Sequence, residues 1–161
     1  MFYNNKAYEA ALEVYEPLYP LLKHKPEFLF EAAQSLSKTG QYEKANEYLE
    51  RAVLLSSDPM LYYVMAKNEQ CLGEYRQAEK HLLHAIDILP ERIYPYYLLM
   101  NLYTEPSYFQ PAKLKKAIDS VLTKKPKVES SAIKEMKESI TPLGFFMFFI
   151  SSSLINPAVL E

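Results

Sequence analysis

The chain has 161 residues, of which 49% are hydrophobic and 24% are charged, and its formal net charge is −2. Its 14 tyrosines and 8 phenylalanines supply too much apolar surface for a disordered chain, and the balance of 18 basic and 20 acidic residues argues against nucleic-acid binding. Three glycines are too few for Gly-rich phosphate loops, and the single cysteine, Cys71, excludes an internal disulfide.

Residues 1–25 predict a single helix that belongs to a repeated pattern. Tyr8-Glu9-Ala10-Ala11 is similar to the later segment Tyr42-Glu43-Lys44-Ala45, which begins the second helix of a repeat. The chain therefore starts inside a repeat. Either a shortened helix caps the stack, or the chain is the C-terminal piece of a longer protein, which is the interpretation we favour.

Residues 26–58 and 59–91 form two copies of a 33-residue repeat. Their apolar residues recur at helical spacing, so each copy predicts a helix, a turn and a second helix. A glycine in each copy supplies the permissive backbone at the turn, and a proline begins each copy. The matching residues are Pro26 and Pro59, Gly40 and Gly73, Tyr42 and Tyr75, Ala45 and Ala78, Leu49 and Leu82, and Ala52 and Ala85.

Residues 92–127 predict a third, degenerate copy. Glu105-Pro106-Ser107 and Pro111 stand where the glycine is expected, with about two additional residues in the turn. The apolar positions remain traceable through Tyr96, Leu99, Met100, Tyr103, Leu114, Ile118 and Val121.

Two further segments follow the repeats. Residues 128–141 predict a charged capping helix, with Ser130 or Ser131 as its N-cap, of the kind that solenoid ends require. Residues 142–161 form an apolar tail, and the uncharged run is long enough for a membrane span, although Ser151-Ser152-Ser153 and Pro157 interrupt it. The tail is expected to dock on the helices, to insert into a membrane through 143–160, or to pair with a second copy as a homodimer.

The repeated residues resemble the tetratricopeptide repeat (TPR), a family whose units carry a Leu-small pair in the first helix and spaced alanines in the second. Here Ala32-Ala33 and Ala66 occupy the small positions of the first helices, whereas Glu69 stands where an aromatic residue is usual. The resemblance implies an all-α fold: a TPR-type α-solenoid of antiparallel helix pairs, with about three repeats, an N-terminal half-repeat and a C-terminal capping helix.

The resemblance also implies a binding surface, because first helices of TPR units line a concave groove. Phe30, Val64, Tyr94 and Leu98 stand at positions where chaperone-binding members carry a polar clamp, so that ligand is disfavoured. An aromatic strip of Phe30, Tyr63 and Tyr97, centred on Tyr63, suits an apolar or aromatic peptide; alternatively these rings only pack against the next helix. The expected groove residues are Glu27, Phe30, Gln34, Ser37, Met60, Tyr63, Lys67, Gln70, Tyr94, Tyr97 and Asn101.

Other candidate residues have ordinary structural interpretations. His81 and His84 lie three apart and could share a metal, but no further ligand stands at a recognised spacing. Cys71 has no base paired with it by sequence, so a buried or half-buried filler is expected. The lysines between Lys113 and Lys127 form a solvated face near a helix end or contact anionic lipid headgroups. We expect no catalytic residue, metal or cofactor.

A second resemblance concerns the cellular context. Residues 90–99, together with 125–130, are similar to the TPR tail of bacterial O-antigen ligase/polymerase-type membrane proteins. Two functions therefore stand beside each other: a non-catalytic protein–protein interaction scaffold, or a regulatory or assembly domain of such a membrane protein. The partner would be a protein or peptide, and the chain would be cytoplasmic or membrane-associated.

Overall fold

The computed structural model describes residues 2–126 and 129–140, with side chains described from Lys6 onward. In this part of the chain the regular secondary structure is helical and contains no strand, which confirms the all-α prediction. The chain divides into two compact units, Met1–Pro90 and Glu91–Glu161, which are described one after the other.

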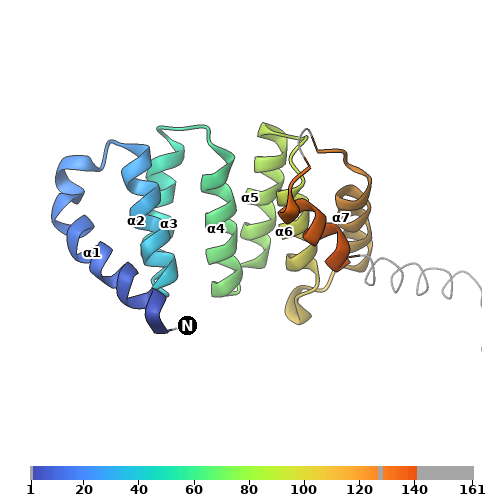
Figure 1. Cartoon of the computed structure of the whole chain (residues 1–161), viewed down its shortest axis with the longest axis horizontal. Helices are drawn as coiled ribbons and strands as arrows, with labels where there is room; N and C mark the ends of the chain where they lie inside the picture. The colour runs from blue at the N-terminus through green and yellow to red at the C-terminus, as the bar shows by residue number, and fades with distance from the viewer. Residues whose placement is uncertain (1, 127–128, 141–161) are drawn as a thin grey trace, which may run out of the picture. The chain divides into compact units, whose positions relative to one another are not determined.

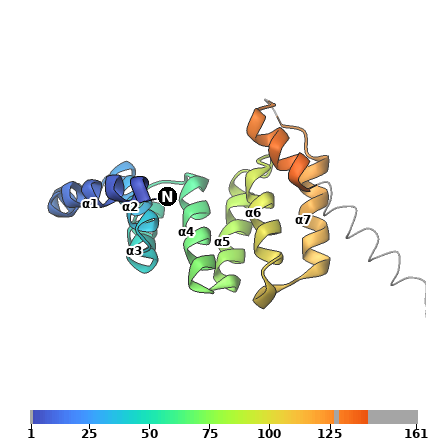
Figure 2. The same cartoon turned by 60° about the horizontal axis from the view of Figure 1, so that its bottom comes forward.

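The first unit is a row of antiparallel helices joined by short turns. It contains α1 (Phe2–Leu22), α2 (Pro26–Lys38), α3 (Tyr42–Val53), α4 (Pro59–Leu72) and α5 (Tyr75–Ile88). Each helix packs against the next in sequence, and α2 also contacts α4, so the first helices of the two repeats are neighbours. Figures 1 and 2 show α4 and α5 side by side along their length. This is the helix-turn-helix arrangement that the 33-residue period predicts.

The helix ends follow from the residues that the repeats share. Pro26 and Pro59 stand in the first turns of α2 and α4, where a missing backbone N–H costs nothing. The Asp58 carboxylate accepts a hydrogen bond from the Met60 N–H at 2.9 Å and caps α4. Gly40 and Gly73 adopt φ angles of 82° and 77°, a left-handed conformation that side chains disfavour, and this explains glycine at both turns.

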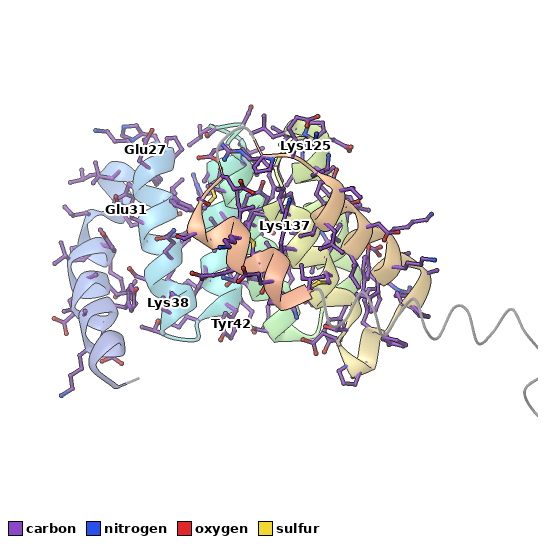
Figure 3. The ribbon with its side chains drawn as sticks, turned by 45° about the vertical axis from the view of Figure 1, so that its right-hand side comes forward. Glu27, Glu31, Lys38, Tyr42, Lys125 and Lys137 are labelled. Atoms are coloured by element: carbon purple, nitrogen blue, oxygen red, sulfur yellow. The ribbon has the colours of Figure 1, made fainter. Side chains whose placement is uncertain are left out.

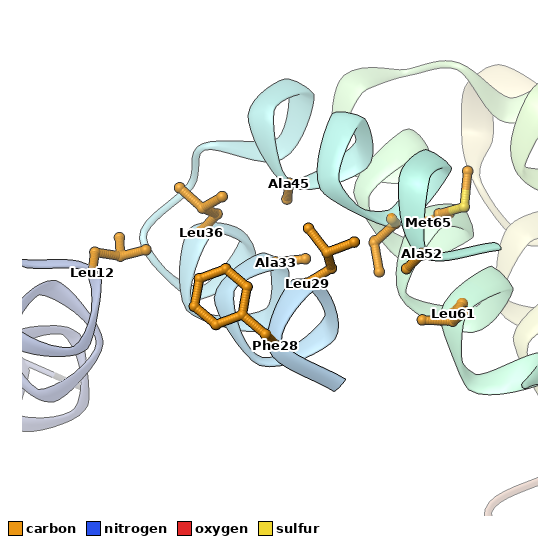
Figure 4. Packing of buried hydrophobic residues seen from close by; sticks show 10 residues of the cluster. Leu12, Phe28, Leu29, Ala33, Leu36, Ala45, Ala52, Leu61 and Met65 are labelled. Carbon is orange, nitrogen blue, oxygen red and sulfur yellow. The ribbon is translucent and has the colours of Figure 1, made fainter. Parts of the chain in front are cut away.

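The core of the first unit lies between the first and second helices of the repeats. Small side chains allow close helix packing: Ala33, Ala45 and Ala52 are completely buried, and leucines fill the space between them. Figure 4 shows Leu12 of α1 at one side of this cluster and Met65 of α4 at the other. The apolar cluster consists of Leu12, Phe28, Leu29, Ala33, Leu36, Ala45, Leu49, Ala52, Leu61 and Met65.

One polar pair is buried between α3 and α4. The Asn68 side-chain amide donates a hydrogen bond to the Asn46 Oδ1 at 2.8 Å, and both side chains are buried. Each amide therefore satisfies part of the other's hydrogen-bonding capacity away from water.

The helix predicted for residues 1–25 extends further toward the N-terminus than its repeat motif, since α1 begins at Phe2 rather than at Tyr8. It lies beside α3 as well as α2. The rings of Tyr19 and Tyr48 stack with centroids 4.6 Å apart, and the Lys44 ammonium lies 2.7 Å from the Glu16 carboxylate. Two prolines, Pro17 and Pro20, occupy interior positions of α1 and remove two backbone donors.

The second unit contains α6 (Tyr94–Tyr103), the short 3₁₀ helix η1 (Pro106–Tyr108), α7 (Pro111–Thr123) and a helical segment at 131–140. η1 occupies the turn where the third copy lacks the glycine. The Ser130 hydroxyl accepts a hydrogen bond from the Ile133 N–H at 3.3 Å, so Ser130 rather than Ser131 caps the last helical segment.

The tail at 142–161 lies outside the described residues, and so do the three predictions made for it. Among the helices that the structure describes, none combines the length and the apolar character needed to cross a bilayer.

Candidate interaction surface

Four of the expected groove residues lie along α2. Their spacing of three or four residues places Glu27, Phe30, Gln34 and Ser37 on one side of the helix. Glu27 and Gln34 are exposed, while Phe30 is half-buried against the apolar cluster. The Ser37 hydroxyl donates a hydrogen bond to the Ala33 carbonyl at 2.9 Å. Figure 3 shows Glu27 near the start of α2 and Lys38 at its end, which gives the extent of this surface.

The equivalent side of α4 is exposed at its ends but not at its centre. Met60 is 42% exposed, Lys67 is exposed and Gln70 is half-buried. Tyr63 is only 4% exposed, so the prediction that its ring is open at the centre of a groove is wrong. At this repeat position the first helix can face either a partner or a neighbouring helix, and here the tyrosine is packed inside the protein.

α2 and α4 touch each other, so their outward sides adjoin within the first unit. We call this surface the first-helix face and define it as Glu27, Phe30, Gln34, Ser37, Met60, Lys67 and Gln70. It combines two exposed polar side chains at equivalent repeat positions, Gln34 and Lys67, with the exposed thioether of Met60.

The remaining expected residues lie on α6, in the second unit. Tyr94, Tyr97 and Asn101 are all half-buried there, and the Asn101 carbonyl accepts a hydrogen bond from the Thr104 hydroxyl at 2.7 Å. Of the four clamp positions, Phe30 and Val64 pack against the apolar cluster and Leu98 is buried. Apolar packing thus occupies positions that a polar clamp would require.

His81 and His84 belong to a packed cluster between α4 and α5. The Nδ1 atom of His81 lies 2.9 Å from the buried carboxylate of Glu69. The Tyr62 ring contacts the imidazoles of His81 and His84, with centroids 5.9 Å and 4.7 Å away. In the described residues no group of three or more His, Cys, Asp or Glu side chains is placed to hold a metal. The sequence marked Glu69 as a departure from the repeat pattern but did not identify His81 as its partner.

Cys71 stands in the last turn of α4 and its side chain is exposed. The expectation of a buried or half-buried filler is therefore wrong, because this position just before Gly73 is directed away from the helix contacts. A side-chain hydrogen bond with Cys71 raises the pKa of the Tyr42 hydroxyl above its usual value.

The basic stretch at the end of the repeats makes local contacts with aromatic rings and helix ends. The Lys113 and Lys124 ammonium groups lie 5.7 Å and 4.9 Å from the ring centroids of Tyr103 and Tyr96 on α6. The Lys137 ammonium donates a hydrogen bond to the Lys124 carbonyl at 3.0 Å, at the C-terminal end of α7. Lys115, Lys116 and Lys125 are exposed. These contacts favour the interpretation of a solvated face near a helix end.

Comparison with known sequences places the resemblance in the first unit. Residues 4–85 match the sequence family described as "Anaphase-promoting complex, cyclosome, subunit 3". A curated relative, the mouse "Tetratricopeptide repeat protein 21A", is 35% identical over 86 residues, which are 53% of this chain. The aligned part is only 6% of that protein's length.

Solved structures show the same fold. A crystal structure of MamA superposes with a TM-score of 0.67 at 17% identity, covering 98% of this chain and 90% of that one. A MamA fragment from Desulfovibrio magneticus RS-1 gives 0.66 at 19% identity, covering 91% of this chain and 86% of that one. The prediction of a TPR fold is confirmed, and with it the general character of a protein-interaction scaffold; such scaffolds are typically not enzymes. The resemblance to O-antigen ligases receives no support from these comparisons.

Proposed function

The chain belongs to the tetratricopeptide-repeat family described as "Anaphase-promoting complex, cyclosome, subunit 3", and from that premise we propose that it is a non-catalytic scaffold that binds a partner protein segment on its first-helix face. The observation that carries this proposal is the exposure of Gln34, Met60 and Lys67 on two first helices that touch each other.

The composition of the face fits a peptide ligand. Polar side chains surround one exposed thioether, and a flexible Met side chain adapts to apolar groups of different shape. Because Tyr63 is buried, the centre of the proposed contact moves to Met60 and Lys67. The ammonium of Lys67 suits a carboxylate on the ligand, whereas Glu27 at the far end of α2 suits a basic group.

The test is a selection of peptides from a displayed random library on the intact chain, followed by affinity measurements on single variants. Lys67→Glu should weaken the selected peptides by about tenfold or more, which corresponds to about 1.4 kcal/mol. The matched control is Lys80→Glu, which makes the same charge change at an exposed lysine of the second helix α5 and should change affinity by less than about twofold.

Gln34→Ala and Met60→Ala should each weaken the same peptides without lowering the melting temperature, since both side chains are exposed. Peptides that tolerate all three changes on the first-helix face but lose binding with Lys80→Glu would place the interaction on the second helices and reject the proposed face. A selection that yields no peptide would also count against it.

A further inference from the structure

α1 has two apolar sides, and one of them is exposed. Leu12, Tyr15, Tyr19 and Leu22 pack toward the rest of the first unit. On the other side Val14, Leu18 and Leu21 are 59%, 36% and 68% exposed, and Ala7 and Ala10 continue the same line toward the N-terminus. Steps of three, four, four and three residues place these five on one side of the helix. We call Ala7, Ala10, Val14, Leu18 and Leu21 the α1 stripe.

The equivalent positions of another second helix are covered. Aligning Tyr8-Glu9-Ala10-Ala11 with Tyr42-Glu43-Lys44-Ala45 places Leu18 opposite Ala52 of α3. Ala52 is completely buried, because α3 lies between α2 and α4, whereas Leu18 is exposed. A second helix in this fold thus has room for helices on two sides. The α1 stripe is continuous, through the half-buried Ala11 and Leu22, with the side of α1 that already packs against helices.

We propose that the α1 stripe is a homodimer interface, in which α1 packs antiparallel against α1 of a second copy. The stripe is small at its N-terminal end and large at its C-terminal end. A two-fold axis through Val14 pairs Ala7 with Leu21 of the second copy and Ala10 with Leu18 of the second copy, while Val14 meets its own equivalent. Each small side chain therefore faces a large one, which gives even packing along four helical turns.

A parallel arrangement would not pack evenly. Leucines would then meet leucines at one end of the stripe, and alanines would leave a gap at the other. The same antiparallel rule does not hold for an arbitrary foreign helix, since the small-to-large gradient of α1 is complemented by its own reversed sequence.

The charges of α1 are compatible with this pairing. Lys6, Glu9, Glu13 and Glu16 all lie off the stripe, and Glu16 is already engaged with Lys44 of α3. Dimerisation therefore buries apolar side chains without removing a charge from water. A single pair of short helices buries less surface than a standard stable interface, so we expect a Kd of about 10–100 µM.

The position of the two-fold axis gives a direct test. In a Cys71→Ser background, Val14→Cys places one thiol on the axis, opposite its own equivalent, so mild oxidation should link two chains by a disulfide. The matched control is Leu54→Cys in the same background, because Leu54 is 83% exposed and lies outside the stripe. We expect covalent dimer from Val14→Cys and monomer from Leu54→Cys. Equal cross-linking of both variants would overturn the proposal.

Sedimentation of the full chain at up to about 0.5 mM, above the expected Kd, tests the pairing rule. Wild type should dimerise and Val14→Asp should be monomeric, with unchanged melting temperatures in dilute solution. Ala7→Leu should also prevent dimerisation by overpacking, and adding Leu21→Ala should restore it. A wild-type chain that stays monomeric, or a dimer that Val14→Asp does not affect, would overturn the proposal, including the case in which a different protein covers the stripe.

Discussion

The two central repeats share backbone geometry but differ in the chemistry of one core contact. In the first repeat Leu36 of α2 is buried and Tyr48 of α3 packs beside the apolar cluster. Thirty-three residues later the same two positions hold Glu69 and His81, which form an ion pair or hydrogen bond at 2.9 Å. The turn glycines and the buried alanines at these repeats are unchanged.

The difference teaches which positions define the repeat. Close helix packing and left-handed turns require Ala and Gly, because a larger side chain cannot fit or a Cβ is strained. The site of Leu36 and Glu69 requires only that the buried group be satisfied, by apolar contacts or by a partner. The second repeat should therefore be more sensitive than the first to loss of a single polar partner.

The largest expected effect distinguishes Tyr63 from its repeat equivalent Phe30. Tyr63 is buried and Phe30 is half-buried, so Tyr63→Ala should lower the free energy of unfolding by about 3–5 kcal/mol and Phe30→Ala by less. Denaturant unfolding of both variants measures the difference. A Tyr63→Ala protein of wild-type stability that has lost peptide binding would return Tyr63 to the binding surface.

Removal of His81 should have the next largest effect. His81→Ala leaves the Glu69 carboxylate buried without its cation and should cost about 3 kcal/mol, the lower end for a broken buried pair because water can reach His81. Tyr48→Ala, the equivalent change in the first repeat, leaves no buried charge behind.

A transplant between the repeats sharpens this test. Glu69→Leu with His81→Tyr installs the residues of the first repeat and should recover most of the stability that His81→Ala loses. If the double variant is less stable than His81→Ala, then the apolar and polar solutions are not interchangeable at this site.

The alanines should behave alike in both repeats. Ala45 and Ala78 are completely buried at equivalent positions, so Ala45→Leu and Ala78→Leu should each overpack a helix contact and cost about 1–3 kcal/mol. Chemical denaturation checks the prediction, and a neutral result for either would show that its helix can move aside.

The smallest effect is expected at the turns. A Cβ at Gly40 or Gly73 would meet nothing within 4 Å, so the cost of valine there comes from the left-handed φ and should be about 1–2 kcal/mol at each. Gly73→Asn should cost less, since asparagine tolerates this conformation better. Thermal unfolding of the three variants would contradict this account if asparagine were as harmful as valine.

The fold was predictable because its determinants are local and recur. Helical spacing of apolar residues, Gly40 and Gly73 at turns, and Pro26 and Pro59 at helix starts all depend on neighbouring residues in sequence. The capping serine was predictable to within one residue for the same reason, and Ser130 is the cap.

The candidate surface was less predictable, because exposure depends on residues that are distant in sequence. Tyr63 and Phe30 occupy equivalent positions, yet only the structure distinguishes the buried ring from the half-buried one. His81 was considered as a metal ligand, whereas its partner Glu69 stands 12 residues earlier and had been noted only as an anomaly. The α1 stripe emerges only when the burial of α1 and α3 is compared.

The buried amides of Asn46 and Asn68 have a consequence for how such a chain can grow. The positions 33 residues away from them hold Glu79 and Ser35, so a copied repeat would not carry the matching pair to its new junction. Insertion of a duplicate between α3 and α4 would leave each amide facing a residue not selected to complement it. The Asn46–Asn68 hydrogen bond thus makes the two repeats an ordered pair, and a tandem duplication would need compensating substitutions at this junction before it could be retained.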